Sequence, residues 1–416
     1  MCLNRMNIMK KEEKDMSKEK VVILGAGYAG LRSLKEIQKK NLNVDITLVN
    51  KNDYHYEATY LHEVASGAQP PKKICYPVKD VVDPKQTTFI QDTVEVINKD
   101  QKTVTLANNG DIDYDYLVVA LGFESETFGI KGAAENGLEM VDIPSALAID
   151  RHINEQFAKY NETKDESYLS IVVCGAGFTS IEFLGEITDQ LPRLVSQYQV
   201  PADKIQLTCI EAMPTLLPMF PEKLTKYGID KLVERGVNFK IGAPIQEVTK
   251  DEVVYKAGDK NESVKAKTIV WTTGVRGSSV IGRSGFDERR GRVVVEKDLT
   301  IAGYPEIFMI GDVSAVMDEE IGRPIPGTAQ LALKQGDTVA ENLEAKLNGK
   351  ETKAFTFKSL GTVASIGNKE AIGEVMGSYL KGYPASAMKK VIADRSLLKT
   401  GGVKAVVSKG RFDLYH

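Results

Sequence analysis

The chain has 416 residues, of which 42% are hydrophobic and 27% charged, and its formal net charge at pH 7 is −3. This length is sufficient for two or three domains with apolar cores, and the balanced charge gives no indication of nucleic-acid binding. Four scattered cysteines without a Cys-x-x-Cys pair argue against a disulfide framework and a zinc site, and the histidines show no metal-ligand spacing. No apolar run reaches the roughly 20 residues that a membrane-spanning helix needs.

Residues 1–17 are polar and lack the apolar core of a secretory signal, so we expect a disordered extension, with Met16 as a plausible alternative start. The organised chain opens on an apolar run, Val21–Leu24, followed by Gly-x-Gly-x-x-Gly at Gly25–Gly30 and then a helical pattern. A buried strand, a glycine turn and a helix in this order predict a site for the pyrophosphate of a dinucleotide, next to the free N–H groups of the helix N-terminus. A glycine turn without a ligand is the alternative for a single copy.

The same pattern returns at Ile171–Ser180, where Gly175 and Gly177 occupy the first two glycine positions. Each copy also has a later apolar strand that ends in glycine, at Gly122 in the first copy and at Gly274 in the second. Two copies of one unit predict an α/β protein with two Rossmann-like dinucleotide-binding domains. Two such domains in one chain imply a flavin held against a nicotinamide.

The second strand of each unit ends at a residue that can accept a hydrogen bond from a ribose. In the second unit Ile205–Ile210 ends at Glu211, whose carboxylate would accept from the 2′-OH and repel a 2′-phosphate, which favours NADH over NADPH. In the first unit Val44–Val49 ends at Asn50, and an amide oxygen can serve there in place of the usual carboxylate. A strand-end glutamate exposed to solvent is the alternative interpretation of Glu211.

Two later segments fit a flavin in the first domain. Ile307–Ile310 is an apolar strand that ends in Gly311 and Asp312, and a carboxylate at a strand end is well placed to accept from ribityl hydroxyls. The helix that starts near Gly327 could turn its N-terminus toward the isoalloxazine. Tyr54–Tyr56 could line a flavin edge, although ordinary packing explains these residues equally well.

Between these motifs we expect short strands at Thr88–Val96 and Thr103–Leu106, a helix at Pro144–Tyr160 and a small sheet that starts at Phe355–Lys358. The polar stretch Asn161–Glu166 then marks the crossing to the second domain. The expected organisation is a disordered extension (1–17), a first domain in two parts (18–162 and 286–348), an inserted second domain (163–285) and a C-terminal membrane-associating region (349–416).

The C-terminal stretch 379–416 is basic and contains apolar residues near helical spacing, such as Met388, Ile392 and Leu398. Such a segment, too short to span, is typical of a helix that lies on an anionic membrane surface. A terminal helix packed on its own domain is the alternative. The charged residues are Lys381, Lys389, Lys390, Arg395, Lys399, Lys404, Lys409 and Arg411 against Asp394 and Asp413.

The cysteines limit where electrons could go after the flavin. Cys75 has no partner four or five residues away, which excludes the cysteine pair of a disulfide reductase. Cys174 and Cys209 lie in the nicotinamide unit, which argues against a sulfide-oxidising quinone reductase. A reductase of oxygen or peroxide that uses Cys75 alone stays open.

Taken together, these motifs resemble type II NADH dehydrogenases, the single-subunit NADH:quinone oxidoreductases that do not pump protons and have a fold like that of glutathione reductase. The resemblance covers about Lys18 to Phe412, and its most specific part is the stretch Ala329–Gln335, which is similar to the family's quinone-site motif Ala-Gln-x-Ala-x-x-Gln. It departs from the family in Ser180, where glycine is more usual, and in a tail without tryptophan. The other matching stretches are Gly25–Gly30, Asn50-Lys51, Gly175–Glu186 and Gly311-Asp312.

The resemblance implies roles for individual residues, with Glu182 as the active-site glutamate and no metal site. Gln330, Gln335 and Ile392 would border the quinone. The positions that would contact FAD are Gly25, Ala26, Gly27, Tyr28, Ala29, Asn50, Lys51, Val94, Asp312, Ala329, Gln330 and Lys389. The positions that would contact NADH are Gly175, Gly177, Glu211 and Gly274.

Physical reasoning supports two of these roles. Glu182 falls near the start of a helix, where a carboxylate desolvated between stacked rings should have a raised pKa and could handle the protons of quinone reduction. A carboxylate that merely complements the helix dipole is the alternative. The amide of Gln330 can donate to a quinone carbonyl, whereas a helix amide that faces solvent is the alternative and fits Gln335 better.

The resemblance further implies one FAD per chain, NADH as substrate and a membrane quinone as acceptor in a respiratory chain. It also implies peripheral attachment to the cytoplasmic face of the cell membrane and a homodimer. One alternative is a soluble NADH-dependent flavoprotein reductase that passes electrons to ferredoxin or oxygen. Another is a flavin-binding interaction or redox-sensing protein without significant turnover.

Overall fold

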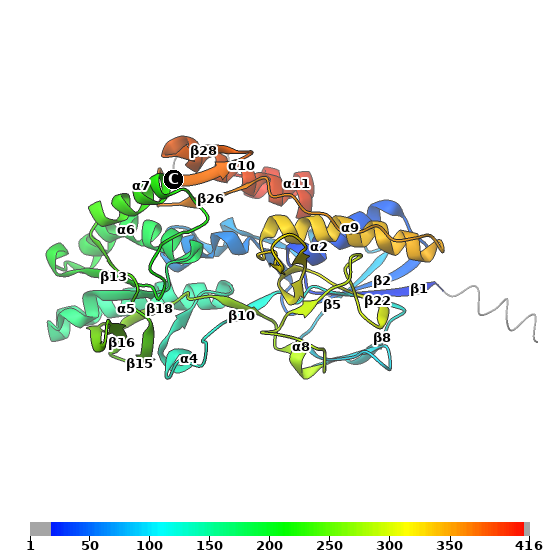
Figure 1. Cartoon of the computed structure of the whole chain (residues 1–416), viewed down its shortest axis with the longest axis horizontal. Coiled ribbons are helices and arrows are strands. Elements are labelled where there is room, and N and C mark those ends of the chain that lie inside the picture. Colours follow the sequence, from blue (N-terminus) through cyan, green and yellow to red (C-terminus); the bar gives the residue numbers. More distant parts are fainter. Residues whose placement is uncertain (1–17, 412–416) are drawn as a thin grey trace, which may run out of the picture.

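The computed structural model describes residues 18–411; the extension expected at residues 1–17 lies outside the described residues, as do residues 412–416. The chain forms two α/β halves side by side, with a C-terminal group of strands and helices lying across both (Figure 1). Each half contains one of the two glycine turns. This confirms the predicted pair of Rossmann-like domains.

A six-stranded sheet forms the centre of the first half. Its strands are β1 (Glu19–Leu24), β2 (Val44–Asn50), β5 (Thr87–Gln91), β9 (Tyr116–Val119), β21 (Thr300–Ile301) and β22 (Tyr304–Met309). They lie in the order β21-β22-β9-β1-β2-β5 and are parallel except at the β21 edge. Val21 and Ile23 of β1 point into one apolar core, while Val22 and Leu24 point into another, because successive strand residues face opposite sides.

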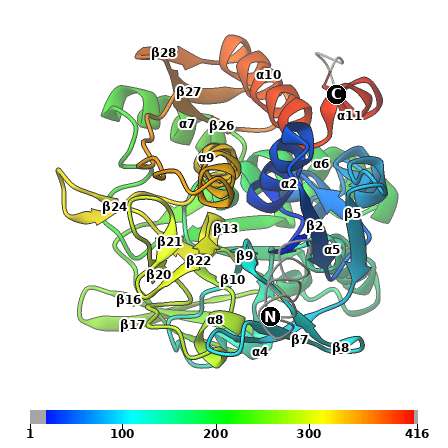
Figure 2. The ribbon, with the colours of Figure 1, turned by 90° about the vertical axis from the view of Figure 1, so that its right-hand side faces the viewer.

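Helices cover one face of this sheet. On that face α2 (Tyr28–Lys40) and α9 (Ala329–Leu347) pack against each other (Figure 2). The other face is covered by α8 (Val280–Arg283) and an antiparallel sheet of β6 (Val94–Asn98), β7 (Thr103–Leu106) and β8 (Gly110–Asp113).

The second half repeats this plan with a five-stranded sheet. Its strands are β11 (Leu138–Glu139), β12 (Ser170–Cys174), β13 (Gln206–Ile210), β14 (Val237–Lys240) and β18 (Thr268–Trp271). All pairs in the order β11-β18-β12-β13-β14 are parallel. One face packs against α5 (Ile143–Thr163), α6 (Phe178–Tyr198) and α7 (Glu222–Glu234); the other packs against β15 (Ile245–Val248), β16 (Glu252–Ala257) and β17 (Lys260–Lys265).

Two expected boundaries differ from the structure. The second sheet already includes β11, so the chain enters the second half before the crossing expected near residue 162. The strand expected at Thr88–Val96 is two strands, β5 and β6, with a break at Asp92. The carboxylate of Asp92 accepts hydrogen bonds from Asn108 and Asn109, and these contacts with the later turn accompany the break.

The two glycine turns have closely similar backbones. Gly25 and Gly175 have φ of +101° and +91°, a region that favours glycine, and a Cβ on Gly25 would lie 2.2 Å from the Ala120 carbonyl oxygen. In the second turn Ser180 stands where the first has glycine. Its hydroxyl is buried and forms a 2.9 Å hydrogen bond with the hydroxyl of Thr272, so this departure from the family pattern is accommodated.

The C-terminal group contains a three-stranded antiparallel sheet and two helices. The elements are β26 (Gly361–Ser365), β27 (Ala371–Val375), β28 (Ser378–Lys381), α10 (Tyr383–Thr400) and α11 (Gly402–Lys409). The small sheet was predicted, but the strand expected at Phe355–Lys358 is absent from the described chain, which has no regular structure there. Among residues 18–411, none of the helices combines the length and the apolarity that crossing a membrane requires.

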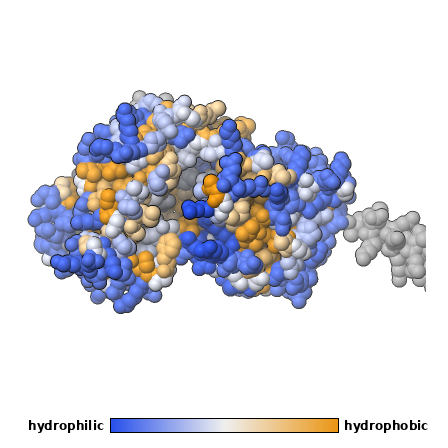
Figure 3. Space-filling view, viewed as in Figure 1, coloured by the Kyte–Doolittle hydropathy of each residue, from blue (hydrophilic) through white to orange (hydrophobic). Residues whose placement is uncertain are grey.

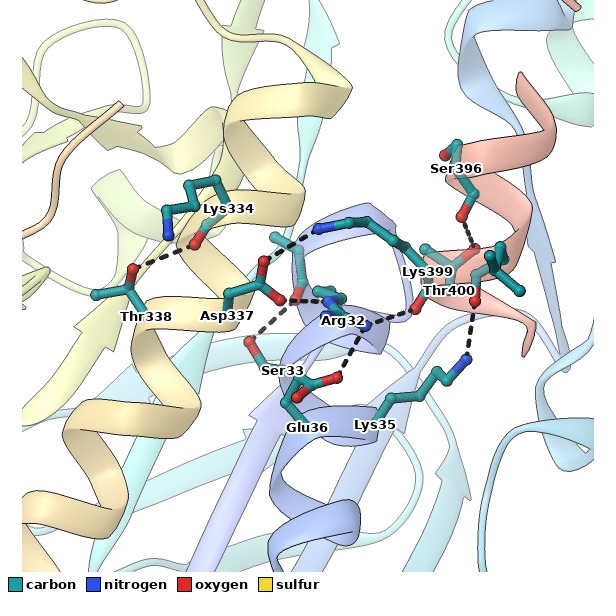
Figure 4. A network of polar contacts seen from close by, with 12 residues as sticks. Arg32, Ser33, Lys35, Glu36, Lys334, Asp337, Thr338, Ser396, Lys399 and Thr400 are labelled. Carbon is teal, nitrogen blue, oxygen red and sulfur yellow. Dashed lines mark hydrogen bonds and ion pairs between the residues drawn. The ribbon is translucent and has the colours of Figure 1, made fainter. Parts of the chain in front are cut away.

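A network of charges fixes the end of α10 to the first half (Figure 4). Arg32 on α2 forms ion pairs with Glu36, at 2.9 Å, and with Asp337 on α9. Lys399 of α10 reaches the same Asp337 at 3.1 Å, and its backbone carbonyl accepts a hydrogen bond from Arg32. Two positive and two negative side chains thus balance at the junction of three helices.

Candidate active site

The first glycine turn opens on a cavity of about 960 Å³ that reaches the interface between the two halves. Lining residues from the second half include Leu138 and Trp271, which come from β11 and β18. Nine of the residues predicted to contact FAD line this cavity: Gly25, Ala26, Gly27, Tyr28, Ala29, Asn50, Lys51, Val94 and Asp312. The other three, Ala329, Gln330 and Lys389, are not among its lining residues.

The phosphate end of the cavity has the features that a dinucleotide needs. Helix α2 begins here without a side-chain cap and without an acidic residue in its first turn, so its N–H groups are available to an anion. A Cβ on Gly27 would meet no atom within 4 Å, so the backbone is open on that side. Close approach of a pyrophosphate therefore needs no rearrangement of the turn.

Asp312 also lines the cavity and lies three residues after the end of β22. Burial raises the pKa of its carboxyl group above the usual value, an effect that Arg292 opposes. Within residues 18–411 no hydrogen bond to this carboxylate is present. A half-buried acceptor that lines the cavity and lacks a donor among the described residues suits a sugar or ribityl hydroxyl, so the residues fit FAD.

Gln335 supports Asp312 and does not face a quinone. Its side chain is 0% exposed; the amide oxygen accepts from the Gly311 N–H at 2.8 Å and the amide nitrogen donates to the Ser314 hydroxyl at 2.9 Å. The prediction of a direct quinone contact is therefore wrong for this residue, and so is the alternative of an amide exposed to solvent. Gln335 is a positioning residue for the loop that carries Asp312.

The second glycine turn is built like the first. Glu211 accepts a hydrogen bond from the Ala176 N–H at 2.7 Å and another from the Met213 N–H at 2.7 Å, which holds its carboxylate at the strand end. Helix α6 also begins without a side-chain cap. Gly175, Gly177, Glu211 and Gly274 belong to this turn and the neighbouring strand ends, outside the residues that line the large cavity.

Glu182 lies in a buried polar cluster between α6, α10 and the small sheet. The residue is 7% exposed, and its carboxylate forms an ion pair with Lys389 and accepts from the Ser365 N–H at 3.2 Å. Nδ1 of His62 lies 3.5 Å from its other oxygen. Burial raises the pKa of Glu182, whereas Lys389 opposes that shift.

Lys389, which was predicted to contact the flavin, lies beside Glu182 in the structure. Its ammonium group is buried, forms the ion pair with Glu182 and donates to the Ser365 hydroxyl at 2.9 Å. It also lies 5.1 Å from the centre of the Tyr60 ring. In this structure Lys389 is thus the partner of the predicted active-site glutamate.

Sequence reasoning missed a second layer of ionisable residues behind Glu182. Atoms of His62, Glu63 and Glu186 lie within 4.8 Å of one another, close enough to ligate a cation. Arg411 already pairs with Glu63 at 2.5 Å and supplies positive charge. Burial, reinforced by Glu63, raises the pKa of Glu186 to about 8, whereas burial keeps the pKa of His62 well below its usual value. The sequence did contain one indication of this cluster, because Glu182 and Glu186 are four residues apart and so lie on the same side of an apolar helix.

Gln330 and Ile392 occupy positions nearer the surface. Gln330 is half-buried at the start of α9, and its amide oxygen accepts from the Leu360 N–H at 2.8 Å. Its amide nitrogen makes no hydrogen bond within the described chain, so it can donate to a ligand. Ile392 on α10 is 39% exposed. The adjoining Ala329 is also half-buried and forms the first residue of α9.

Comparison with known proteins places this geometry in a family. The sequence profile described as "Pyridine nucleotide-disulphide oxidoreductase" matches residues 19–336. Proteins of Staphylococcus aureus strains NCTC 8325 / PS 47 and COL, both named "Type II NADH:quinone oxidoreductase", are 44% identical over 399 residues, which is 95% of this chain and 99% of theirs.

Two solved structures share the fold. NDH2 from Plasmodium falciparum in complex with NADH has a TM-score of 0.85 at 18% identity and covers 94% of this chain and 97% of its own. Sulfide:quinone oxidoreductase from Aquifex aeolicus has a TM-score of 0.76 at 21% identity, with 96% coverage of both chains. The resemblance found in the sequence is confirmed, and the chain belongs to the type II NADH:quinone oxidoreductases.

Proposed function

We propose that the chain oxidises NADH with FAD bound in the large cavity and passes two electrons to a membrane quinone, without pumping protons. The observation that carries this function is the presence of two uncapped glycine turns, one in each half, in a chain 44% identical to named NADH:quinone oxidoreductases. FAD supplies the two-electron chemistry when bound. The alternative of a ferredoxin or oxygen reductase is not favoured by these relatives.

The residues around the cavity orient the two nucleotides. The N-terminus of α2 would hold the FAD pyrophosphate and Asp312 would accept from the ribityl chain. Glu211 would accept from the ribose of NADH, and Lys51 is available to an anionic group because its ammonium, 3.1 Å from Asp142, is more than half exposed. One FAD per chain follows from one such cavity at the first turn.

Glu182 and Lys389 together would hold and move a proton for quinone reduction. A quinone that receives two electrons also takes up two protons, so a group that exchanges protons must lie near it. The carboxylate of Glu182 and the ammonium of Lys389 form a buried pair whose charges compensate each other. Gln330, whose amide N–H groups make no hydrogen bond within residues 18–411, would donate to a quinone carbonyl from the start of α9.

The C-terminal helices would attach the protein to the cytoplasmic face of the cell membrane. Val391, Leu398, Val403 and Val407 are 49–73% exposed on α10 and α11. Figure 3 shows apolar side chains along the edge where these helices lie. Basic residues of the same helices would attract anionic lipids. Ile392 lies beside this surface and would border the quinone entrance.

A homodimer is part of the proposal through the family resemblance.

Stopped-flow spectroscopy tests the proposed function directly. Anaerobic NADH should bleach the flavin absorbance near 450 nm, and a short-chain quinone should then restore it at a rate that matches steady-state turnover. Ferredoxin or oxygen should restore it much more slowly. Fast reduction by NADH followed by no response to quinone would refute the quinone as the acceptor.

A further inference from the structure

The two glycine turns are held differently, although their backbones are alike. In both, the N–H after the first glycine donates to the strand-end side chain: Ala26 to Asn50 at 2.9 Å and Ala176 to Glu211 at 2.7 Å. The carbonyl oxygen of Ala26 also meets a side chain, since Nδ1 of His55 lies 2.8 Å away. Over residues 18–411, no side chain donates to the corresponding carbonyl of Ala176.

The sequence explains this difference, because the two units have different residues at the position five after the strand end. His55 stands five residues after Asn50, and Leu216 stands five residues after Glu211. A leucine side chain has no hydrogen-bond donor. Side chains therefore bind both the N–H and the carbonyl of Ala26 in the first turn, but only the N–H of Ala176 in the second.

The ring of His55 is fixed in place. It lies on β3 (Tyr54–Tyr56), which pairs with β4 (Cys75–Pro77), and its residue is 1% exposed. Its ring centre is 4.9 Å from that of Tyr76 and 5.4 Å from that of Tyr28, which meets it edge-on. A donor held so firmly restricts the Ala26 carbonyl to one orientation.

Hydrogen-bond complementarity also assigns the protons of His55. Because a carbonyl oxygen can only accept, Nδ1 must carry the hydrogen that faces Ala26. Nε2 then faces Oε1 of Glu57 at 3.5 Å, and among the described residues neither atom has a hydrogen-bond partner. The Nε2 side of the ring thus lies directly against the Glu57 carboxylate inside the protein.

Glu57 connects this contact back to the glycine turn. Its other oxygen accepts from the hydroxyl of Tyr28 at 3.0 Å, and Tyr28 lines the cavity. His55 therefore holds the turn at two points: directly at Ala26 and, through Glu57, at Tyr28.

We propose that His55 is a positioning residue that preorganises the first glycine turn so that FAD is retained, and that the absence of such a clamp at the second turn suits nucleotide exchange. This rests on the proposed function, in which FAD stays bound through every turnover while NADH enters and NAD⁺ leaves. A loop already fixed in its bound conformation loses less freedom on binding, so its ligand dissociates more slowly.

Three substitutions separate the two contacts of the ring. His55→Asn places an amide nitrogen near the position of Nδ1 and keeps a donor for Ala26. His55→Gln places its amide near the position of Nε2 and keeps only the contact to Glu57. His55→Phe retains a planar ring between Tyr28 and Tyr76 but removes both polar contacts.

The measurement is the rate at which FAD leaves the diluted holoenzyme, followed by the rise of free-flavin fluorescence. His55→Gln and His55→Phe should release FAD about tenfold faster than the parent, whereas His55→Asn should stay within about twofold, as expected for one buried hydrogen bond. The dissociation constant of NADH should not change in any variant.

Equal release rates for the Asn and Gln variants, or an unchanged rate for the Phe variant, would overturn the clamp. Thermal unfolding of the FAD-stripped proteins serves as a control for stability, and if the release rates follow only that stability, His55 is merely structural and the proposal is wrong. Because FAD release is measured without an acceptor, its result does not depend on whether quinone is the electron acceptor.

Discussion

Glu182 and Lys389 are 207 positions apart in the chain and form a buried ion pair. Glu182→Gln preserves the shape of the side chain but removes the charge and the exchangeable proton. We expect turnover with quinone to fall about 100-fold or more, as for loss of a general acid or base, while NADH still reduces the flavin. Steady-state kcat and stopped-flow flavin reduction distinguish these steps.

The matched control for Glu182→Gln addresses the charge that it leaves behind. An unpaired buried lysine destabilises a fold, so the double variant Glu182→Gln/Lys389→Met should recover thermal stability without recovering turnover. If the single variant turns over at the parental rate across the pH range, the catalytic role of Glu182 is wrong.

Glu186 should make the stability of the protein depend on pH. Its pKa is raised to about 8 in the folded protein, from an ordinary value of 4.5. Between these values the folded state binds more protons than the unfolded state, so the free energy of unfolding falls as pH rises from about 5 to about 8. The slope for one such group approaches about 1.4 kcal/mol per pH unit.

Urea unfolding at pH 6 and pH 8 measures this slope. Glu186→Gln should flatten it and stabilise the protein at pH 8 relative to the parent, whereas Glu222→Gln, on the exposed face of α7, should leave it unchanged. A parental slope in the Glu186→Gln protein would show that another group is responsible.

Which residues could be predicted from the sequence depends on how local their contacts are. Asn50 and Glu211 were found because strand, glycine turn and strand end lie within one short unit. Gln335 was misassigned because its partners, Gly311 and Ser314, belong to another loop, and no spacing within α9 reveals them. His62 was not identified either, since it reaches the site only after α3 (Leu61–Ala65) packs on α6.

At the scale of elements, α11 should be the point of membrane contact. Val403 and Val407 are four residues apart, on one side of the helix, and are 69% and 73% exposed. Replacing both by Asp removes apolar area from the interface and adds negative charge, so we expect at least a tenfold loss of binding to vesicles that contain phosphatidylglycerol.

Co-sedimentation with these vesicles checks this expectation. Val294→Asp, at a residue that is 60% exposed in the first half, is the control and should bind as the parent does. Equal binding of the α11 variant and the control would exclude α11 as the attachment site. Turnover with a water-soluble quinone analogue should be normal in both.

Elements with strong local patterns were predicted well, and short or non-local ones were not. Helix α5 and strand β7 match their expected positions closely. Strand β11 has only two residues and is defined by pairing with β18, more than 100 positions later, so no local pattern marks it.

On the scale of the whole molecule, the sequence predicted two domains because the glycine turns repeat. It did not predict how the C-terminal group joins them. The small sheet packs on α6 and α7 of the second half, while the end of α10 is fixed to α2 and α9 of the first. Both attachments use contacts between distant segments, from 62 positions apart for Lys399 and Asp337 to 367 for Arg32 and Lys399, which composition and periodicity do not encode.

The distance in the chain between Glu182 and Lys389 also matters while the protein is being made. A ribosome adds about 5–20 residues per second, so α6 emerges roughly 10–40 s before the helix that supplies its partner. Gly185 on the same helix packs closely against the backbone of Ile366 and Gly367, so this part of α6 stays uncovered for nearly as long. At this stage the part of α6 that carries Glu182 and Gly185 lacks the contacts that the C-terminal group provides. The ion pair between Glu182 and Lys389 is thus among the last contacts of the protein to form after translation begins.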